Sequence, residues 1–270
     1  MRLGLGSYAY AWAIGVPGHP PARPWTAFDL LDEAARLRVG LVQFCDNLPL
    51  TQLAPADLDR FEARARELEI QIELGTLGLH PENLRAYLRL ARRFASPFVR
   101  VVVDSPGDEP TPEEIVARLH PLATEFNAAG VKIDLENHDR LKSRTLAWIV
   151  EQLGPERAGV CLDTVNSFGS LEGPEVVVGT LGSHTLCLHA KDFTIRRASH
   201  RMGFTLEGCP AGQGQLDVPW LLRQLASSPH PFNVILETWV PPDHTLAATI
   251  VRERTWTETG KNFLRALIPD

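Results

Sequence analysis

The sequence predicts an α/β fold, a single (β/α)₈ TIM barrel over residues 1–270. Eight short apolar runs alternate with eight amphipathic stretches, and this alternation indicates a parallel sheet with helices outside it. The length of 270 residues matches the ~250 residues typical of such a barrel. No linker, change of composition or low-complexity tract divides the sequence. Eight repeats at this length favour closure into a barrel over an open sheet, so we expect one domain.

The predicted strands are short runs rich in Val, Ile and Leu, each flanked by turn residues. Near-continuous apolar runs of this kind are typical of strands that are buried on both faces. In chain order they are Leu3–Ser7, Leu41–Cys45, Ile70–Leu74, Val99–Val103, Val131–Leu135, Gly159–Leu162, Thr185–His189 and Asn233–Glu237.

The predicted helices lie between these strands and carry apolar residues on one face. In Pro55–Leu68, for example, Leu58, Phe61 and Ala65 share a face, and the leading proline suits a first helical turn. In chain order the helices are Thr26–Arg38, Pro55–Leu68, Pro81–Phe94, Pro112–Ala129, Ser143–Leu153, Pro174–Leu181, Val218–Ala226 and His244–Leu267.

Composition and charge exclude several classes of function. Hydrophobic residues make up 44% and charged residues 22%, which is typical of a soluble protein with a sizeable core. The net charge of −6 argues against a nucleic-acid surface, which needs an excess of cations. No stretch approaches the ~20 apolar residues of a membrane span. We therefore expect a cytoplasmic protein that binds neither nucleic acid nor membrane.

Common short motifs of other enzyme classes do not occur in the sequence. The four cysteines form no CxxC pair, so structural zinc and thioredoxin-like redox chemistry lack their spacing. Gly4-Leu5-Gly6 lacks the third glycine of a dinucleotide-binding motif, and we interpret it as a strand end. Walker A, HExxH and GxSxG motifs are also missing.

The last four predicted strands each end in a residue that binds metals. Glu136, Asp163, His189 and Glu237 stand where barrel enzymes carry their working residues. Three carboxylates and one imidazole suit a divalent cation, Mn²⁺ or Mg²⁺ first, with Co²⁺ and Zn²⁺ as alternatives. Without a cation the carboxylates would repel one another. Taken singly, each glutamate also fits a helix cap, Asp163 fits a turn and His189 fits an ordinary core histidine. The set of four together favours one metal site.

Five segments, LENH, CLDTVNS, HAKDF, GQGQLD and ILETW, resemble the xylose isomerase-like barrel superfamily of sugar isomerases and epimerases. Its members include ketose 3-epimerases, inosose dehydratases and hydroxypyruvate isomerases. The resemblance implies that the four residues at the strand ends hold one divalent metal, with no organic cofactor. It also implies that Glu136 and Glu237 form the acid/base pair, moving a proton α to a metal-chelated carbonyl through an enediolate.

Three candidate substrate-binding residues lie close to these ligands in the sequence. Asn166 occupies a position where the resembled epimerases often carry a histidine that contacts substrate. His138 either orients Glu136, contacts a substrate hydroxyl or is a plain loop histidine. Lys191 has the strand parity to point into the barrel, and the alternative is a capping lysine paired with Asp192.

Two further candidates lie farther from the ligands. Arg201 is our choice among three arginines after the seventh strand, because the resembled epimerases carry an arginine there. Trp12, with Tyr8 and Tyr10, follows the first strand and forms either an apolar wall against the sugar or ordinary core packing. The loop Gly212–Gly214 matches a family loop in which glycine permits close backbone approach, and a phosphate is one candidate ligand for it.

The leading interpretation is a metal-dependent isomerase or epimerase of a keto sugar or sugar derivative, acting in carbohydrate metabolism. The alternative is a lyase on the same site, such as an inosose or dehydroshikimate dehydratase, because both begin with proton abstraction α to a carbonyl. An abasic-site endonuclease would need more ligands and a basic surface, and a non-catalytic sugar-binding barrel would not need two glutamates. The expected partner is a small sugar, with a homo-oligomer as the expected assembly.

Overall fold

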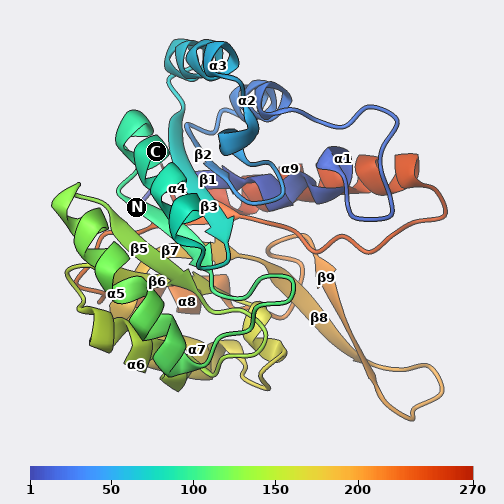
Figure 1. Cartoon of the computed structure of the whole chain (residues 1–270). Coiled ribbons are helices and arrows are strands. Elements are labelled where there is room, and N and C mark those ends of the chain that lie inside the picture. The colour runs from blue at the N-terminus through green and yellow to red at the C-terminus, as the bar shows by residue number, and fades with distance from the viewer. Residues whose placement is uncertain (270) are drawn as a thin grey trace.

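Eight parallel strands form a closed barrel with the helices outside it, as the sequence predicts (Figure 1). The computed structural model describes residues 1–269. The strands follow the order β1-β10-β7-β6-β5-β4-β3-β2 around the barrel. They are β1 (Leu3–Gly6), β2 (Leu41–Phe44), β3 (Gln71–Leu77), β4 (Phe98–Val102), β5 (Lys132–Glu136), β6 (Ala158–Asp163), β7 (Thr185–Ala190) and β10 (Asn233–Leu236).

The eight predicted helices all form, with ends within a few residues of the prediction. Thr26 and Thr111 each begin a helix through a capping box, and prolines occupy the first turn of several others. The helices are α2 (Ala27–Arg36), α3 (Pro55–Glu67), α4 (Pro81–Phe94), α5 (Pro112–Ala128), α6 (Ser143–Leu153), α7 (Pro174–Leu181), α8 (Val218–Leu225) and α9 (Leu246–Leu267). A short α1 (Ala11–Ile14) follows the first strand. None of the helices within residues 1–269 is both long and apolar enough to cross a bilayer.

A β-hairpin after the seventh barrel strand was not predicted. Strands β8 (Asp192–Arg197) and β9 (Phe204–Cys209) pair antiparallel and project from the barrel as a two-stranded arm (Figure 1). The sequence signal is the alternation in Phe193-Thr194-Ile195-Arg196, a pattern of period two that is typical of a strand with one polar face.

The main core lies between the barrel and the surrounding helices, and a smaller apolar cluster is separate from it. The members of the smaller cluster are Leu41, Phe98, Cys161, Leu186, Cys187 and Ile235. Close to this cluster the barrel also encloses polar groups, because Gln43, Glu73 and Asp134 are fully buried. Glu73 accepts hydrogen bonds from Gln43 Nε2 (3.3 Å) and Asn233 Nδ2 (2.8 Å). Because Asn233 is the first residue of β10, these contacts link the middle of the barrel to the amino-terminal end of its strands.

Glu73 is expected to make the free energy of unfolding fall as the pH rises through the neutral range. Burial, with a smaller contribution from Cys187, raises the pKa of Glu73 from 4.5 to about 8. The folded chain therefore keeps a proton that the unfolded chain releases above about pH 4.5. The stabilisation is complete below that pH and falls by ~1.4 kcal/mol per pH unit until the folded pKa is passed.

Urea unfolding at several pH values between 5 and 8 measures this slope. The neutral, isosteric Glu73→Gln variant should show a slope shallower by ~1.4 kcal/mol per pH unit. Equal slopes in the variant and the original chain would show that Glu73 does not titrate in this way.

Candidate metal and substrate site

The four predicted ligands meet at the carboxyl end of the barrel. Glu136 and Asp163 end β5 and β6, His189 lies on β7, and Glu237 directly follows β10. All four are buried. His189 Nδ1 lies 3.6 Å from Glu136 Oε2, 3.8 Å from Asp163 Oδ2 and 3.5 Å from Glu237 Oε2. The structure thus brings one imidazole nitrogen and three carboxylate oxygens around a common point.

These residues fit a divalent cation. The ligand atoms of Glu136, Asp163 and His189 all lie within 4.8 Å of one another, and Glu237 joins them through its contact with His189. His189 Nδ1 and Glu237 Oε1 are buried and take part in no hydrogen bond among the described residues, and Asp163 Oδ2 and Glu237 Oε2, also buried, form ion pairs with the Lys191 ammonium. Buried polar atoms without hydrogen bonds are costly, and a cation with oxygen and nitrogen ligands would satisfy all of them.

The orientation of His189 is fixed from the side opposite the carboxylates. Its Nε2 lies 2.7 Å from Gln43 Oε1, an acceptor, so Nε2 carries a proton and Nδ1 faces the cluster, where it would present a lone pair to a bound cation. Burial alone would lower the pKa of His189, but the carboxylates of Glu237 and Glu136 raise it to about 9.

The side chain of Glu237 packs against Gly6 at the end of β1. A Cβ atom at position 6 would lie 2.7 Å from Glu237 Oε1, so glycine is required there.

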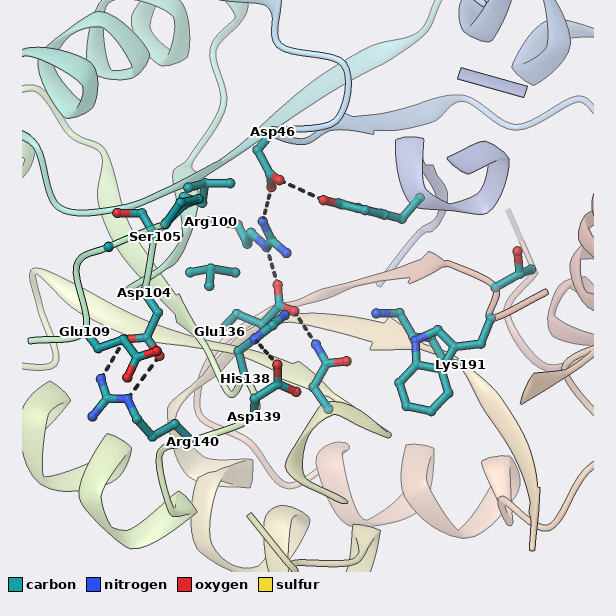
Figure 2. Close-up of a pocket in the computed structure, with 18 residues that line it drawn as sticks. Asp46, Arg100, Asp104, Ser105, Glu109, Glu136, His138, Asp139, Arg140 and Lys191 are labelled. Atoms are coloured by element: carbon teal, nitrogen blue, oxygen red, sulfur yellow. Dashed lines mark hydrogen bonds and ion pairs between the residues drawn. The ribbon is translucent and has the colours of Figure 1, made fainter. Parts of the chain in front are cut away.

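Both carboxylate oxygens of Glu136 are held by neighbouring side chains. Arg100 from β4 forms a buried ion pair with Oε2, and Asn166 Nδ2 donates a hydrogen bond of 2.7 Å to Oε1. Arg100 also binds Asp46 at 2.9 Å, so it lies between the two carboxylates (Figure 2). Burial raises the pKa of Glu136, but Arg100, His189 and Lys191 outweigh it and lower the pKa to about 2.

Lys191 points into the site rather than toward its sequence neighbour Asp192. Its Nζ lies 2.7 Å from Asp163 Oδ2 and 2.9 Å from Glu237 Oε2, at distances of ion pairs. Burial would lower the pKa of Lys191, but the two carboxylates outweigh burial and hold the pKa well above its usual range. The lysine therefore remains an ammonium, and the alternative of a capping lysine paired with Asp192 is excluded.

A cavity of about 570 Å³ opens above the cluster and is large enough for a small sugar derivative. Glu136 and Lys191 form part of its floor, and Tyr8, Leu77 and Trp239 line its sides. At the outer wall Arg140 pairs with Asp104 at 2.6 Å (Figure 2). The cavity is thus lined mostly by charged and polar side chains, with a few apolar and aromatic residues among them.

The structure brings three of the five predicted substrate residues to this cavity. His138, Asn166 and Lys191 line it, and His138 Nδ1 lies 3.2 Å from Asp139 Oδ2. Arg201 lies in the exposed turn of the β8–β9 hairpin, outside the cavity lining. Trp12 is half-buried, also outside the lining, and its Nε1 donates to the Val240 carbonyl at 2.8 Å. Substrate contact by these residues stays a prediction.

Sequence reasoning missed Arg100 and Asp46. Arg100 was hidden inside the apolar run Val99–Val103, although a lone charge at an inward-facing strand position is itself a signal. Asp46 follows β2 at the same end of the barrel as the four ligands and also escaped notice. Tyr8, one of the three aromatic residues after β1, donates its hydroxyl to Asp46 Oδ2 at 2.7 Å.

The Gly212–Gly214 loop binds an internal carboxylate. The backbone N–H groups of Gly212 and Gly214 both donate to Asp192 Oδ2 at 2.9 Å, and Leu216 N donates to Oδ1 at 3.1 Å. A Cβ atom at position 214 would lie 2.1 Å from Asp192 Oδ1, so glycine is needed for this approach. These donors are already used, and the arrangement gives no support to a phosphate site there.

Comparison with known proteins places this geometry among related barrels. A family model described as "Xylose isomerase-like TIM barrel" matches residues 31–267. The chain is 33% identical to the 3-oxo-isoapionate decarboxylase of Pectobacterium atrosepticum over 266 residues, which cover 98% of this chain and 95% of that protein.

Two solved structures share the fold at low sequence identity. A xylose isomerase-like TIM barrel protein from Mycobacterium smegmatis, in complex with magnesium, aligns with a TM-score of 0.70 at 10% identity, covering 97% of each chain. D-psicose 3-epimerase from Clostridium cellulolyticum H10, with D-tagatose, aligns with a TM-score of 0.70 at 14% identity, covering 98% of this chain and 99% of that one.

Proposed function

The chain belongs to the family of xylose isomerase-like TIM barrels, and we propose that it is a divalent-metal-dependent decarboxylase of a 3-oxo sugar acid. The observation that carries the proposal is the pair of contacts that occupies both carboxylate oxygens of Glu136. The full-length similarity to 3-oxo-isoapionate decarboxylase supports the same class of substrate.

Epimerisation at a carbon next to a carbonyl needs one group to remove a proton and a second group to return one. Glu136 is poorly suited to either step, because Arg100 and Asn166 already bind its two oxygens. Those contacts suit a fixed metal ligand. Decarboxylation needs only one proton transfer to the substrate. It therefore fits a site in which Glu136, one of the two predicted acid/base residues, has both oxygens bound by neighbouring side chains.

In the proposed reaction the bond between the carboxylate carbon and its neighbouring carbon breaks. The electron pair of that bond moves toward the oxygen of the ketone one carbon farther along, CO₂ leaves, and one proton is added to the carbon that has lost it. Glu136, Asp163, His189 and Glu237 would hold the cation. When bound, that cation would supply Lewis acidity at the ketone oxygen.

Lys191 is the proposed proton donor. Its ammonium group lines the cavity, and the Asp163 and Glu237 carboxylates fix its position. After the donation, neutral Lys191 would regain a proton from solvent in the cavity that it lines, and the Asp163 and Glu237 carboxylates, at 2.7 and 2.9 Å from its Nζ, favour the return to the ammonium form.

The isomerase or epimerase activity expected from the sequence, and its dehydratase alternative, stay predictions for this site. NMR in D₂O with the metal-loaded protein distinguishes the three reactions over a panel of 3-oxo sugar acids, ketoses and inososes. The proposal expects CO₂ release from a 3-oxo acid and one deuterium in the product, with activity lost on chelation and restored by Mn²⁺ or Mg²⁺. Deuterium exchange into a ketose without loss of carbon, or loss of water from an inosose, would contradict it.

A further inference from the structure

The β8–β9 hairpin is amphipathic, and its apolar face is turned outward. Directly paired residues of an antiparallel ribbon share a face. One face carries the pairs Ile195–Leu206 and Arg197–Phe204, and the guanidinium of Arg197 lies 4.2 Å from the Phe204 ring centroid. The opposite face is polar, with Thr205 among its residues. The apolar face therefore has the composition of a surface that another element covers.

The exposure of this face is unusual for the molecule. Nine large hydrophobic residues are exposed among residues 1–269, and four of them belong to this one hairpin. They are Ile195, Met202, Phe204 and Leu206, with exposed fractions of 40%, 84%, 64% and 41%. A two-stranded hairpin is at best marginally stable alone in water. Clustered exposed apolar side chains mark an interaction surface more often than single ones do.

The apolar face continues into a groove at the base of the hairpin. The groove encloses about 400 Å³, and its walls include Phe168, Phe193 and Trp220. The rings of Phe168 and Phe193 pack edge to face with their centroids 4.8 Å apart, which anchors the base of the hairpin. Two exposed acids, Glu175 and Asp217, also line the groove, and neither forms an ion pair within residues 1–269.

The charges of the hairpin and the groove are opposite. Residues 192–209 contain three arginines, one aspartate and one glutamate, a formal charge of +1 in a chain of −6. The arginines gather toward the tip of the hairpin, whereas Glu175 and Asp217 lie at its base. A single chain keeps these charges apart because the hairpin projects from the barrel (Figure 1).

We propose that the hairpin is a dimerisation arm that packs its apolar face against the same face of a second copy of this chain. A two-fold axis crossing the ribbon near Ile195 makes the two arms antiparallel, as an isologous interface requires. The basic tip of each arm then reaches the acidic groove at the base of the other, and Phe204 covers apolar surface near Phe193. A second copy thus satisfies the apolar face and the charges together.

Sedimentation velocity of the full chain between about 1 and 100 µM tests the proposal. The unmodified chain is expected to be a dimer, and Phe204→Glu should raise its dissociation constant at least ~100-fold, because it places a charge in the centre of the apolar contact. Thr205→Glu, on the polar face of the same strand, is the matched control and should remain dimeric. Circular dichroism establishes that each variant is folded.

A chain that is monomeric at every concentration would overturn the proposal, and so would a Phe204→Glu variant that dimerises as well as the unmodified chain.

Reversing the charges of the groove and the tip tests the antiparallel arrangement of the two arms. Glu175→Arg alone should weaken the dimer by repelling the partner's tip, and adding Arg201→Glu should restore at least part of the affinity. No recovery in the double variant would rule out this pairing of tip and groove.

Discussion

Replacing Asp163 with asparagine is expected to abolish binding of the divalent cation and to lower turnover at least ~10³-fold. Asp163 Oδ2 is buried, and it lies 3.8 Å from His189 Nδ1 and 2.7 Å from the Lys191 ammonium nitrogen. An amide presents a neutral oxygen where the cluster presents a charged one. The loss of a ligand charge weakens a hard cation site directly.

Asp104→Asn is the matched control, because Asp104 also lines the cavity but pairs with Arg140 at its outer wall. Metal content per chain and calorimetric titration with Mn²⁺ measure the difference. The unmodified chain and the Asp104→Asn variant should each hold about one ion, and the Asp163→Asn variant none. Full metal content in the Asp163→Asn variant would show that Asp163 is not a ligand.

The charge balance of the cluster explains why a divalent ion is expected beside two resident cations. Glu136 and Asp46 share Arg100, so one of these two negative charges is uncompensated. Asp163 and Glu237 likewise share Lys191. This surplus of two negative charges matches one divalent cation, whereas in its absence a protonated His189, whose pKa is raised to about 9, offsets only one of them.

The barrel was predictable because its strands and helices carry strong local signals. Each barrel strand is a short apolar run, and helices such as α5 begin at a capping threonine followed by proline. The β8–β9 hairpin was missed for a physical reason. Its outer strand Phe204–Cys209 is exposed except at its inner end, so its pattern resembles a polar loop rather than a core strand.

The meeting of the four predicted ligands was predictable because parallel strands deliver their carboxyl ends to one face of the barrel. Arg100 was not found, because its contact with Glu136 spans 36 positions in the sequence and depends on the inward parity of β4. Arg201 was chosen from a loop whose course the sequence leaves open. The chain folds that loop into a hairpin, which carries Arg201 away from the cavity lining.

Lys191→Met is expected to lower kcat by ~10²–10⁴-fold while leaving the metal in place. Methionine keeps much of the length of the lysine side chain and removes the ammonium group that lies 2.7 Å from Asp163 and 2.9 Å from Glu237. Removal of this positive charge beside two ligand carboxylates should favour binding of a cation, so affinity for Mn²⁺ should hold or increase. Loss of turnover with retained metal separates a proton donor from a residue that only holds the site together.

The matched control is Arg140→Met, which removes a cation from the outer wall of the same cavity. If Arg140 only contacts substrate, its loss should raise KM with little change in kcat, whereas loss of the donor should act mainly on kcat. Steady-state kinetics with a 3-oxo sugar acid, together with metal analysis of each variant, gives both quantities. A Lys191→Met variant that keeps its metal and decarboxylates at the original rate would exclude Lys191 as the proton donor.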